Sequence, residues 1–190
     1  MTTMKNLMYF LLALTMMSCN KKNEEISPDS IYHVNSQWEQ QEGKEITFSD
    51  LKGKVLVTAM IFTSCTTACP RLTSEMKNIS KKVGEVNSDD IRYVLITIDP
   101  DNDTPEVMKK YLTNYKLNGS EWLFLRGNDE DVRTLANVMA VKYKQISPVE
   151  FSHSNIISVY SKDGTLAFQK EGLNVEIDET VDAIKKQLKL

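Results

Sequence analysis

The sequence lacks several features that would identify a class of function at once. Its 23 basic and 26 acidic residues give a net charge of −3, and no basic stripe interleaved with aromatic side chains indicates a nucleic-acid-binding surface. No internal repeat and no low-complexity block is present. Beyond residue 17 no apolar run is long enough to cross a membrane. These properties predict one ordinary domain with a full core.

The N-terminal stretch "MTTMKNLMYFLLALTMMSC" is typical of a secretory signal. Lys5 precedes an apolar run over residues 7–17 that is too short to span a bilayer comfortably. Cys19 comes directly after "TMMS", as at a bacterial lipoprotein cleavage site, although two methionines stand where smaller residues are usual. We therefore predict a lipoprotein signal peptide over residues 1–18 and a lipid-modified Cys19. The alternative is an ordinary signal peptide or an uncleaved anchor in which this cysteine is incidental.

A polar, charged segment follows the predicted lipidation site. Residues 19–30, with the sequence "NKKNEEISPDS" after the cysteine, predict a flexible tether that lifts a domain off a membrane surface. Residues 31–190 are predicted to form that domain. The expected location is the bacterial cell envelope, with the lipid in a membrane and the domain in the periplasm.

Strand and helix patterns alternate along the predicted domain. The apolar run "VLVTAMIF" indicates a strand buried on both faces, and a helical face of Leu72, Met76, Ile79, Val83 and Val86 follows it. The full set is a β-hairpin in 31–54, strands at 55–62, 91–99 and 121–127, helices starting near Cys69 and near Thr104, a helix over 128–140, a hairpin of 155–161 with 165–172, and a helix over 178–190. This order predicts an α/β protein with a thioredoxin-like three-layer α/β/α fold, a mixed central sheet and an added N-terminal β-hairpin.

Cys65 and Cys69 lie four residues apart in "FTSCTTACP", where the first buried strand meets the first long helix. They are candidates for a buried pair, a disulfide, a redox couple or half of a metal site. A disulfide that closes so small a loop restricts the unfolded chain very little, so it would stabilise the fold weakly. The N-terminus of a helix stabilises thiolates, so both cysteines should ionise more easily than free cysteine. A spacing of four brings both sulfurs to one side of the first turn, and thiolates as ligands select Cu(I) or Zn.

His153 is the candidate for a third member of this site. It lies directly before the predicted strand 155–161, and in a thioredoxin-like topology the loop entering that strand faces the cysteine loop. The alternative is a histidine with no ligand role, which is how we interpret His33 in the N-terminal hairpin. A structural zinc site has four protein ligands and no open coordination position. Cys65, Cys69 and His153 supply three ligands, so they favour an open copper site over a structural zinc site.

Three segments, "FTSCTTACP", "VLITIDPDNDTPEVMKKYL" and "FSHSNIISVYSKDG", together resemble the Sco/SenC family over about residues 53–164. Members of that family are membrane-tethered, thioredoxin-fold proteins that bind copper and help to assemble the binuclear copper centre of cytochrome c oxidase. The resemblance implies that Cys65, Cys69 and His153 are the copper ligands, with Cu(I) as the expected form and Cu(II) left open. The implied partner is the copper-accepting subunit of cytochrome c oxidase or another envelope cuproprotein.

The chain departs from the family pattern at two places. Thr66, Thr67 and Ala68 stand where the family usually has a proline and an acidic residue between its cysteines. Ser152 stands where the family usually has an aspartate, so a carboxylate that could orient the imidazole is missing. The aspartate-rich run "IDPDNDTPE" is interpreted as a turn and a helix cap, with a partner-facing acidic patch as the alternative.

These residues, with the resemblance, predict a membrane-tethered copper metallochaperone. It would bind copper through the cysteine pair and His153 and deliver it to, or prepare the thiols of, the binuclear copper centre of cytochrome c oxidase. The main alternative is a metal-independent thiol–disulfide oxidoreductase of the cell envelope that uses Cys65 and Cys69 as its redox pair and leaves His153 without a role. A peroxidase that uses Thr63 and Arg71 around one cysteine is a weaker alternative. A sensor whose cysteines merely form a disulfide is another, and the role of His153 distinguishes it from a copper protein.

Overall fold

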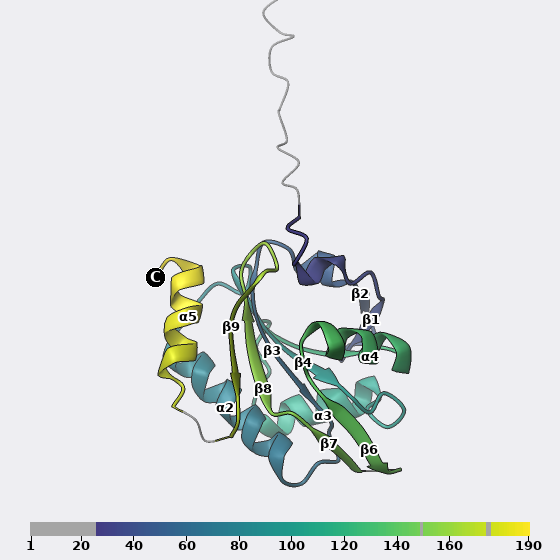
Figure 1. Cartoon of the computed structure of the whole chain (residues 1–190). Coiled ribbons are helices and arrows are strands. Elements are labelled where there is room, and N and C mark those ends of the chain that lie inside the picture. Colours follow the sequence, from purple (N-terminus) through teal and green to yellow (C-terminus); the bar gives the residue numbers. More distant parts are fainter. Residues whose placement is uncertain (1–25, 149, 174–175) are drawn as a thin grey trace, which may run out of the picture.

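The computed structural model describes residues 26–148, 150–173 and 176–190, which form a mixed β-sheet with helices on both faces (Figure 1). Seven strands lie in the order β2-β1-β5-β4-β3-β8-β9, and a separate hairpin pairs β6 with β7. The strands are β1 (Trp38–Gln40), β2 (Glu45–Ile46), β3 (Val55–Ile61), β4 (Ile91–Thr97), β5 (Trp122–Arg126), β6 (Tyr143–Ser147), β7 (Glu150–His153), β8 (Ile156–Tyr160) and β9 (Leu166–Glu171). The helices are α2 (Ala68–Val83), α3 (Pro105–Tyr115), α4 (Asp129–Val138) and α5 (Asp178–Leu188), with 3-10 helices η2 (Ile31–His33) and η3 (Phe48–Leu51).

The central strand is the one that the apolar run predicted. All seven residues of β3 are buried, and β3 pairs in parallel with β4 and antiparallel with β8. Helices α2 and α3 lie side by side, with the hydroxyls of Thr73 and Tyr111 2.8 Å apart, and α5 packs beside α2. Figure 1 shows α4 on the opposite face of the sheet. The predicted three-layer α/β/α arrangement with a mixed sheet is therefore confirmed.

Helix α2 carries the cysteine loop into the fold. It begins at Ala68, in agreement with the predicted start near Cys69. The predicted apolar face is buried at Leu72, Met76, Ile79 and Val83, but Val86 lies beyond the end of the helix. Gly84 ends the helix because its φ of 94° is a conformation that residues with a Cβ rarely adopt.

The N-terminal hairpin exists but is shorter than predicted. The N-terminal hairpin consists of the short strands β1 and β2, and β1 also joins the main sheet antiparallel to β5. The flanking residues form η2 and η3 instead of longer strands. The Ser30 hydroxyl accepts a hydrogen bond from the Tyr32 amide, and Thr47 and Asp50 form a capping box, so these side chains stabilise helical turns locally.

The β6–β7 hairpin was not predicted. Its residues are mostly exposed, so the apolar alternation that identifies a strand is weak there. His153 is consequently the last residue of β7, rather than part of a loop that enters the next strand. The following strand, β8, agrees with the prediction, and all five of its residues are buried.

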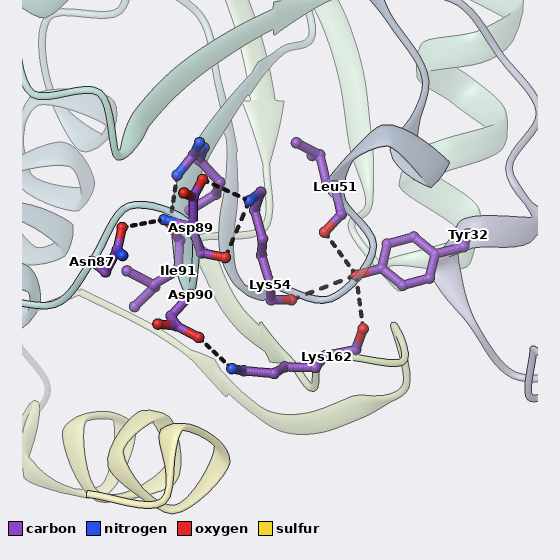
Figure 2. A network of polar contacts seen from close by, with 9 residues as sticks. Tyr32, Leu51, Lys54, Asn87, Asp89, Asp90, Ile91 and Lys162 are labelled. Carbon is purple, nitrogen blue, oxygen red and sulfur yellow. Dashed lines mark hydrogen bonds and ion pairs between the residues drawn. The ribbon is translucent and has the colours of Figure 1, made fainter. Parts of the chain in front are cut away.

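A network of polar contacts closes the end of the sheet where β3 starts (Figure 2). The Tyr32 hydroxyl lies 3.2 Å from the carbonyl oxygen of Leu51 and 3.4 Å from that of Lys162. The Ile31 amide donates to the carbonyl of Gly164, where a Cβ would lie 2.7 Å from the Tyr32 ring. We call this end, formed by Ile31, Tyr32, Leu51, Lys162 and Gly164, the tyrosine pole. The chain enters the fold here, whereas the cysteine loop follows the opposite end of β3.

Three sequence predictions fall wholly or partly beyond the described residues. The predicted signal peptide and the predicted lipid-bearing Cys19 lie outside them. Within the described ranges, none of the helices combines the length and the apolar character needed to span a bilayer. Ser30, at the end of the predicted tether, is buried and donates to the Asp163 carbonyl at 2.7 Å.

Candidate functional site

Cys65 and Cys69 converge at the start of α2. Cys65 lies in the loop after β3 and is half-buried, whereas Cys69 is in the first helical turn and fully buried. Both are free thiols. The Cys69 amide donates to the Cys65 sulfur over 3.4 Å, and the hydroxyl of Thr67 lies 3.9 Å from the same sulfur. Backbone amides of the helix start thus face the Cys65 sulfur, as the sequence predicted from the position of the pair.

The two thiols differ in acid strength. Burial raises the pKa of the Cys65 thiol, but hydrogen bonds from the backbone of Cys69, Thr67 and Ala68 outweigh it and bring the pKa below its ordinary value. Burial raises the pKa of the Cys69 thiol far above its usual range, and the neighbouring Cys65 and Asp103 add to the effect. In the metal-free protein the Cys65 thiol is therefore the more easily ionised of the two, and Cys69 keeps its proton to higher pH. The prediction that both thiols ionise easily holds for Cys65 only.

His153 lies against the cysteine pair. Its Nε2 is 3.3 Å from the Cys69 sulfur, and its Nδ1 is 3.0 Å from the carbonyl oxygen of Ser154. Because a carbonyl only accepts, we assign the proton to Nδ1, which leaves Nε2 with a free lone pair toward the thiol. Burial lowers the pKa of the imidazole, which keeps it neutral. The Ser154 carbonyl thus orients the ring in this chain, where Ser152 supplies no carboxylate for that role.

Aromatic side chains fix the position of the histidine. The Phe62 ring meets His153 edge-on, with centroids 5.9 Å apart, and packs against Phe151 of β7 at 5.2 Å. Phe62 is buried and directly follows β3, so it connects the core to the β6–β7 hairpin. These contacts hold the imidazole of a peripheral hairpin at the helix start.

An open cleft beside the hairpin reaches His153 but neither cysteine. The cleft, of about 420 Å³, is lined by Lys142, Tyr143, Lys144, Ser152, His153, Ser154, Asn155, Glu171 and Gly172. In the described part of the chain, no group of three or more His, Cys, Asp and Glu side chains is already spaced to hold a metal ion. The Cys65 sulfur faces the amides of α2, while Cys69 and His153 are in contact with each other.

The acidic run after β4 is a turn, as predicted, but one of its members reaches the site. Asp99 is buried and accepts both contacts of the Asn102 amide group, at 2.9 and 3.0 Å. Asp103 is fully buried and accepts hydrogen bonds from Thr63 in the cysteine loop and from Thr97. Sequence reasoning missed this contact, because an aspartate before a helix cap is explained equally well by turn chemistry.

The remaining candidates do not join the pair. The Thr63 hydroxyl donates to Asp103, and Arg71 is exposed on α2, so neither is arranged around a cysteine in the way a peroxidase requires. His33 lies near the tyrosine pole, is exposed, and contacts the carbonyl of Ser27 at 2.9 Å. Its interpretation as incidental to the site agrees with this position.

Several Sco proteins are similar to this chain in sequence and in fold. A SCO1 protein homologue of Bacillus subtilis (strain 168) is 28% identical over 190 residues, covering 97% of both chains. BsSco, described as a member of the Sco family of cytochrome c oxidase assembly proteins with a disulfide switch, is 29% identical with a TM-score of 0.71, covering 81% of this chain and 91% of its own. A SCO1/SenC family lipoprotein from Bacillus anthracis str. Ames is 26% identical with a TM-score of 0.73, covering 80% and 92%.

A structure determined with copper also shares the fold. ScoI of Bradyrhizobium japonicum, solved with copper bound, is 24% identical with a TM-score of 0.68, covering 80% of this chain and 96% of its own. The family model described as SCO1/SenC matches residues 29–189, which is nearly the whole described domain. With the thioredoxin-like sheet and the thiol–imidazole contact at its cysteine loop, the chain belongs to the SCO1/SenC family.

Proposed function

We propose that this protein is a copper metallochaperone that binds copper through Cys65, Cys69 and His153 and delivers it to the binuclear copper centre of cytochrome c oxidase. The observation that carries the proposal is the 3.3 Å contact between the Cys69 sulfur and His153 Nε2, beside the Cys65 sulfur at the same helix start. Two thiolates and an imidazole form a soft donor set that suits Cu(I). The copper is cargo in this role.

Each donor has a distinct part in capture. The Cys65 thiolate is partly accessible and offers the first ligand. His153 is already neutral, with its lone pair on Nε2, so it binds without losing a proton. Cys69 carries a proton in the metal-free protein, and that proton leaves when the sulfur binds copper. The adjacent cleft gives an acceptor protein access to His153, and Cys65 is partly exposed, so ligand exchange among soft donors can transfer the ion.

The site is expected to depend on all three side chains. In the full chain carrying Cys19→Ala, we expect one Cu(I) to bind tightly and His153→Ala to weaken binding by about a hundredfold or more, since loss of a mere supporting partner already costs roughly 10–100-fold. His33→Ala is the matched control and should retain the affinity. Competition with a chromophoric Cu(I) chelator measures both. A wild-type chain without tight binding, or His153→Ala with full affinity, would refute the three-ligand site.

We also propose a location and anchor for this role. The leader over residues 1–18 and Cys19 support a lipid anchor in the cell envelope, and a homologue described as a lipoprotein supports it further. Mass spectrometry of the membrane-extracted protein tests this. An N-terminal diacylglycerol-modified cysteine at position 19 is expected, and Cys19→Ala should leave the protein unlipidated.

A second candidate is a thiol–disulfide oxidoreductase, which the unequal thiols favour. The Cys65 thiolate would attack an acceptor disulfide, forming a mixed disulfide and releasing one acceptor thiolate. Cys69 would then attack Cys65, forming the internal disulfide and releasing the second acceptor thiolate. We expect Cys69→Ser to trap the mixed disulfide and His153→Ala to leave the first attack intact, so the two functions separate at His153.

A further inference from the structure

Asp103 is a buried carboxylate with three donors. Its oxygens lie 3.3 and 3.2 Å from the Thr63 amide nitrogen, and the hydroxyls of Thr63 and Thr97 also donate to it. The Thr97 hydroxyl accepts from the Asp99 amide at 2.9 Å, which fixes the direction of its own proton toward Asp103. The carboxylate thus accepts hydrogen bonds from two different segments of the chain.

The two segments differ in their attachment to the fold. Thr97 ends the buried strand β4, and the Asp103 amide is itself bonded to the Asp99 carbonyl at 3.0 Å, directly before the cap of α3. Thr63 belongs to the loop between β3 and α2, two residues before Cys65. Asp103 therefore connects the cysteine loop, through hydrogen bonds, to the C-terminal end of the neighbouring strand β4.

Fold stability alone does not require a carboxylate at this point. Removing an ionised group from water is unfavourable, and buried polar pairs can often be replaced by apolar residues without loss of stability. Hydrogen bonds to a charged acceptor are, however, shorter and more directional than neutral ones. A carboxylate is thus suited to holding a loop in one position.

We propose that Asp103 is a positioning residue, which holds the loop that carries Cys65 so that both sulfurs stay together at the start of α2. This inference rests on the proposed function for its purpose, since a fixed pair serves both copper capture and thiol exchange. A fixed loop raises the effective concentration of one thiol beside the other. Loss of Asp103 should weaken every reaction that uses both sulfurs.

The metal-free reduction potential tests the proposal without copper. In the full chain with Cys19→Ala, the two thiols are equilibrated with dithiothreitol. As Cys65 and Cys69 form the S–S bond, they lose two electrons and two protons to oxidised dithiothreitol, which becomes the reduced dithiol. We expect Asp103→Ala to make the protein disulfide about tenfold less favoured, a shift of about 30 mV to higher potential. Cu(I) affinity should fall by a similar factor.

Thr63→Val tests whether the position of the loop or the charge of Asp103 sets the reduction potential. This variant removes a donor from the loop but keeps the carboxylate, so it should shift the potential in the same direction by less. The double variant with Asp103→Ala should shift it no further than Asp103→Ala alone. An unchanged potential in Thr63→Val beside a shifted one in Asp103→Ala would overturn the proposal, because charge would then be the cause.

Tyr32→Phe is the control for general destabilisation. It removes a buried hydroxyl at the tyrosine pole (Figure 2) without touching the cysteine loop. We expect it to lower the stability toward urea and leave the potential unchanged. A shift in Tyr32→Phe equal to that in Asp103→Ala would overturn the positioning role. Wild-type protein that binds no copper would refute the metallochaperone proposal, while the potentials would still decide the role of Asp103.

Discussion

Two thiols four residues apart have different chemistry because one turn of helix separates their surroundings. The Cys65 sulfur receives backbone donors at the helix start, whereas the Cys69 sulfur is buried among apolar side chains with a carboxylate nearby. Only the thiolate form of cysteine is strongly nucleophilic. We therefore expect the Cys65 sulfur to be the more reactive of the two in the reduced protein.

Alkylation of the reduced protein should show this difference. With limiting iodoacetamide at pH 7, we expect Cys65 to react at least about tenfold faster than Cys69, as measured by peptide mass spectrometry. The pKa of Cys65 is below its ordinary value, so its rate should rise with pH and level off at lower pH than that of a free cysteine. In urea the two rates should become similar. Equal rates in the folded protein would contradict the assignment of Cys65 as the more reactive thiol.

The orientation of His153 rests on a backbone atom. Ser152 supplies no carboxylate for this role, and the sequence left the ring without an evident partner. The carbonyl of Ser154 fills this role at 3.0 Å from Nδ1. A backbone acceptor is fixed by the chain path, so the tautomer is maintained without a second ionisable group.

The β6–β7 hairpin is the element that brings the imidazole to the cysteines. Its connection to the core runs through the ring contact between Phe151 and Phe62. We expect Phe151→Ala to weaken Cu(I) binding about tenfold while all three ligands remain, since such aromatic pairs contribute about 0.5–1.5 kcal/mol beyond the area they bury. Chelator competition measures this.

The exposed end of the same hairpin supplies the matched control. Ile146 is 62% exposed and lies in β6. Ile146→Ala should leave Cu(I) affinity within about twofold of wild type, because no buried contact is lost. If both variants bind copper equally well, His153 is held by something other than the hairpin packing.

The sequence predicted the elements whose burial leaves a periodic pattern. Strands β3, β4 and β8 are buried along nearly their whole length, so each was located to within two residues. Helix α2 has a single apolar face, and its start was located to within one residue, but its predicted face ran three residues past its end. The β6–β7 hairpin has no such pattern because it is exposed on the surface. The extent of the N-terminal hairpin was wrong because side-chain caps at Ser30 and Thr47 stabilise local turns.

The candidate site was predictable where local spacing defines it. Cys65 and Cys69 are close in sequence, so the helix turn alone brings them together. His153 required the topology of the fold, since 84 residues separate it from Cys69. Asp103 could not be predicted, because its contact with Thr63 depends on how the ends of two neighbouring strands meet.

The whole molecule separates its attachment from its chemistry. The chain enters the fold at the tyrosine pole, beside the start of β3, and the cysteine loop follows the other end of that strand (Figure 1). With the lipid anchor that we propose, the copper site would face away from the membrane surface. An acceptor domain that projects from the same membrane could then approach it.

Copper should stabilise the whole fold, since its proposed ligands come from the β3–α2 loop, from α2 and from β7. A ligand present at about 100 times its Kd stabilises the native state by roughly 2.7 kcal/mol. For a domain of this size that predicts a rise in Tm of roughly 5–10 °C. Differential scanning calorimetry of the reduced chain with Cys19→Ala measures it, and a Cu(I) chelator in excess should return the Tm to the metal-free value.

His33→Ala should show the full rise. His153→Ala should lose most of it, because copper then binds through two cysteines only four residues apart, which an unfolded chain also offers. An equal rise in His153→Ala would mean that copper does not connect the hairpin to the helix.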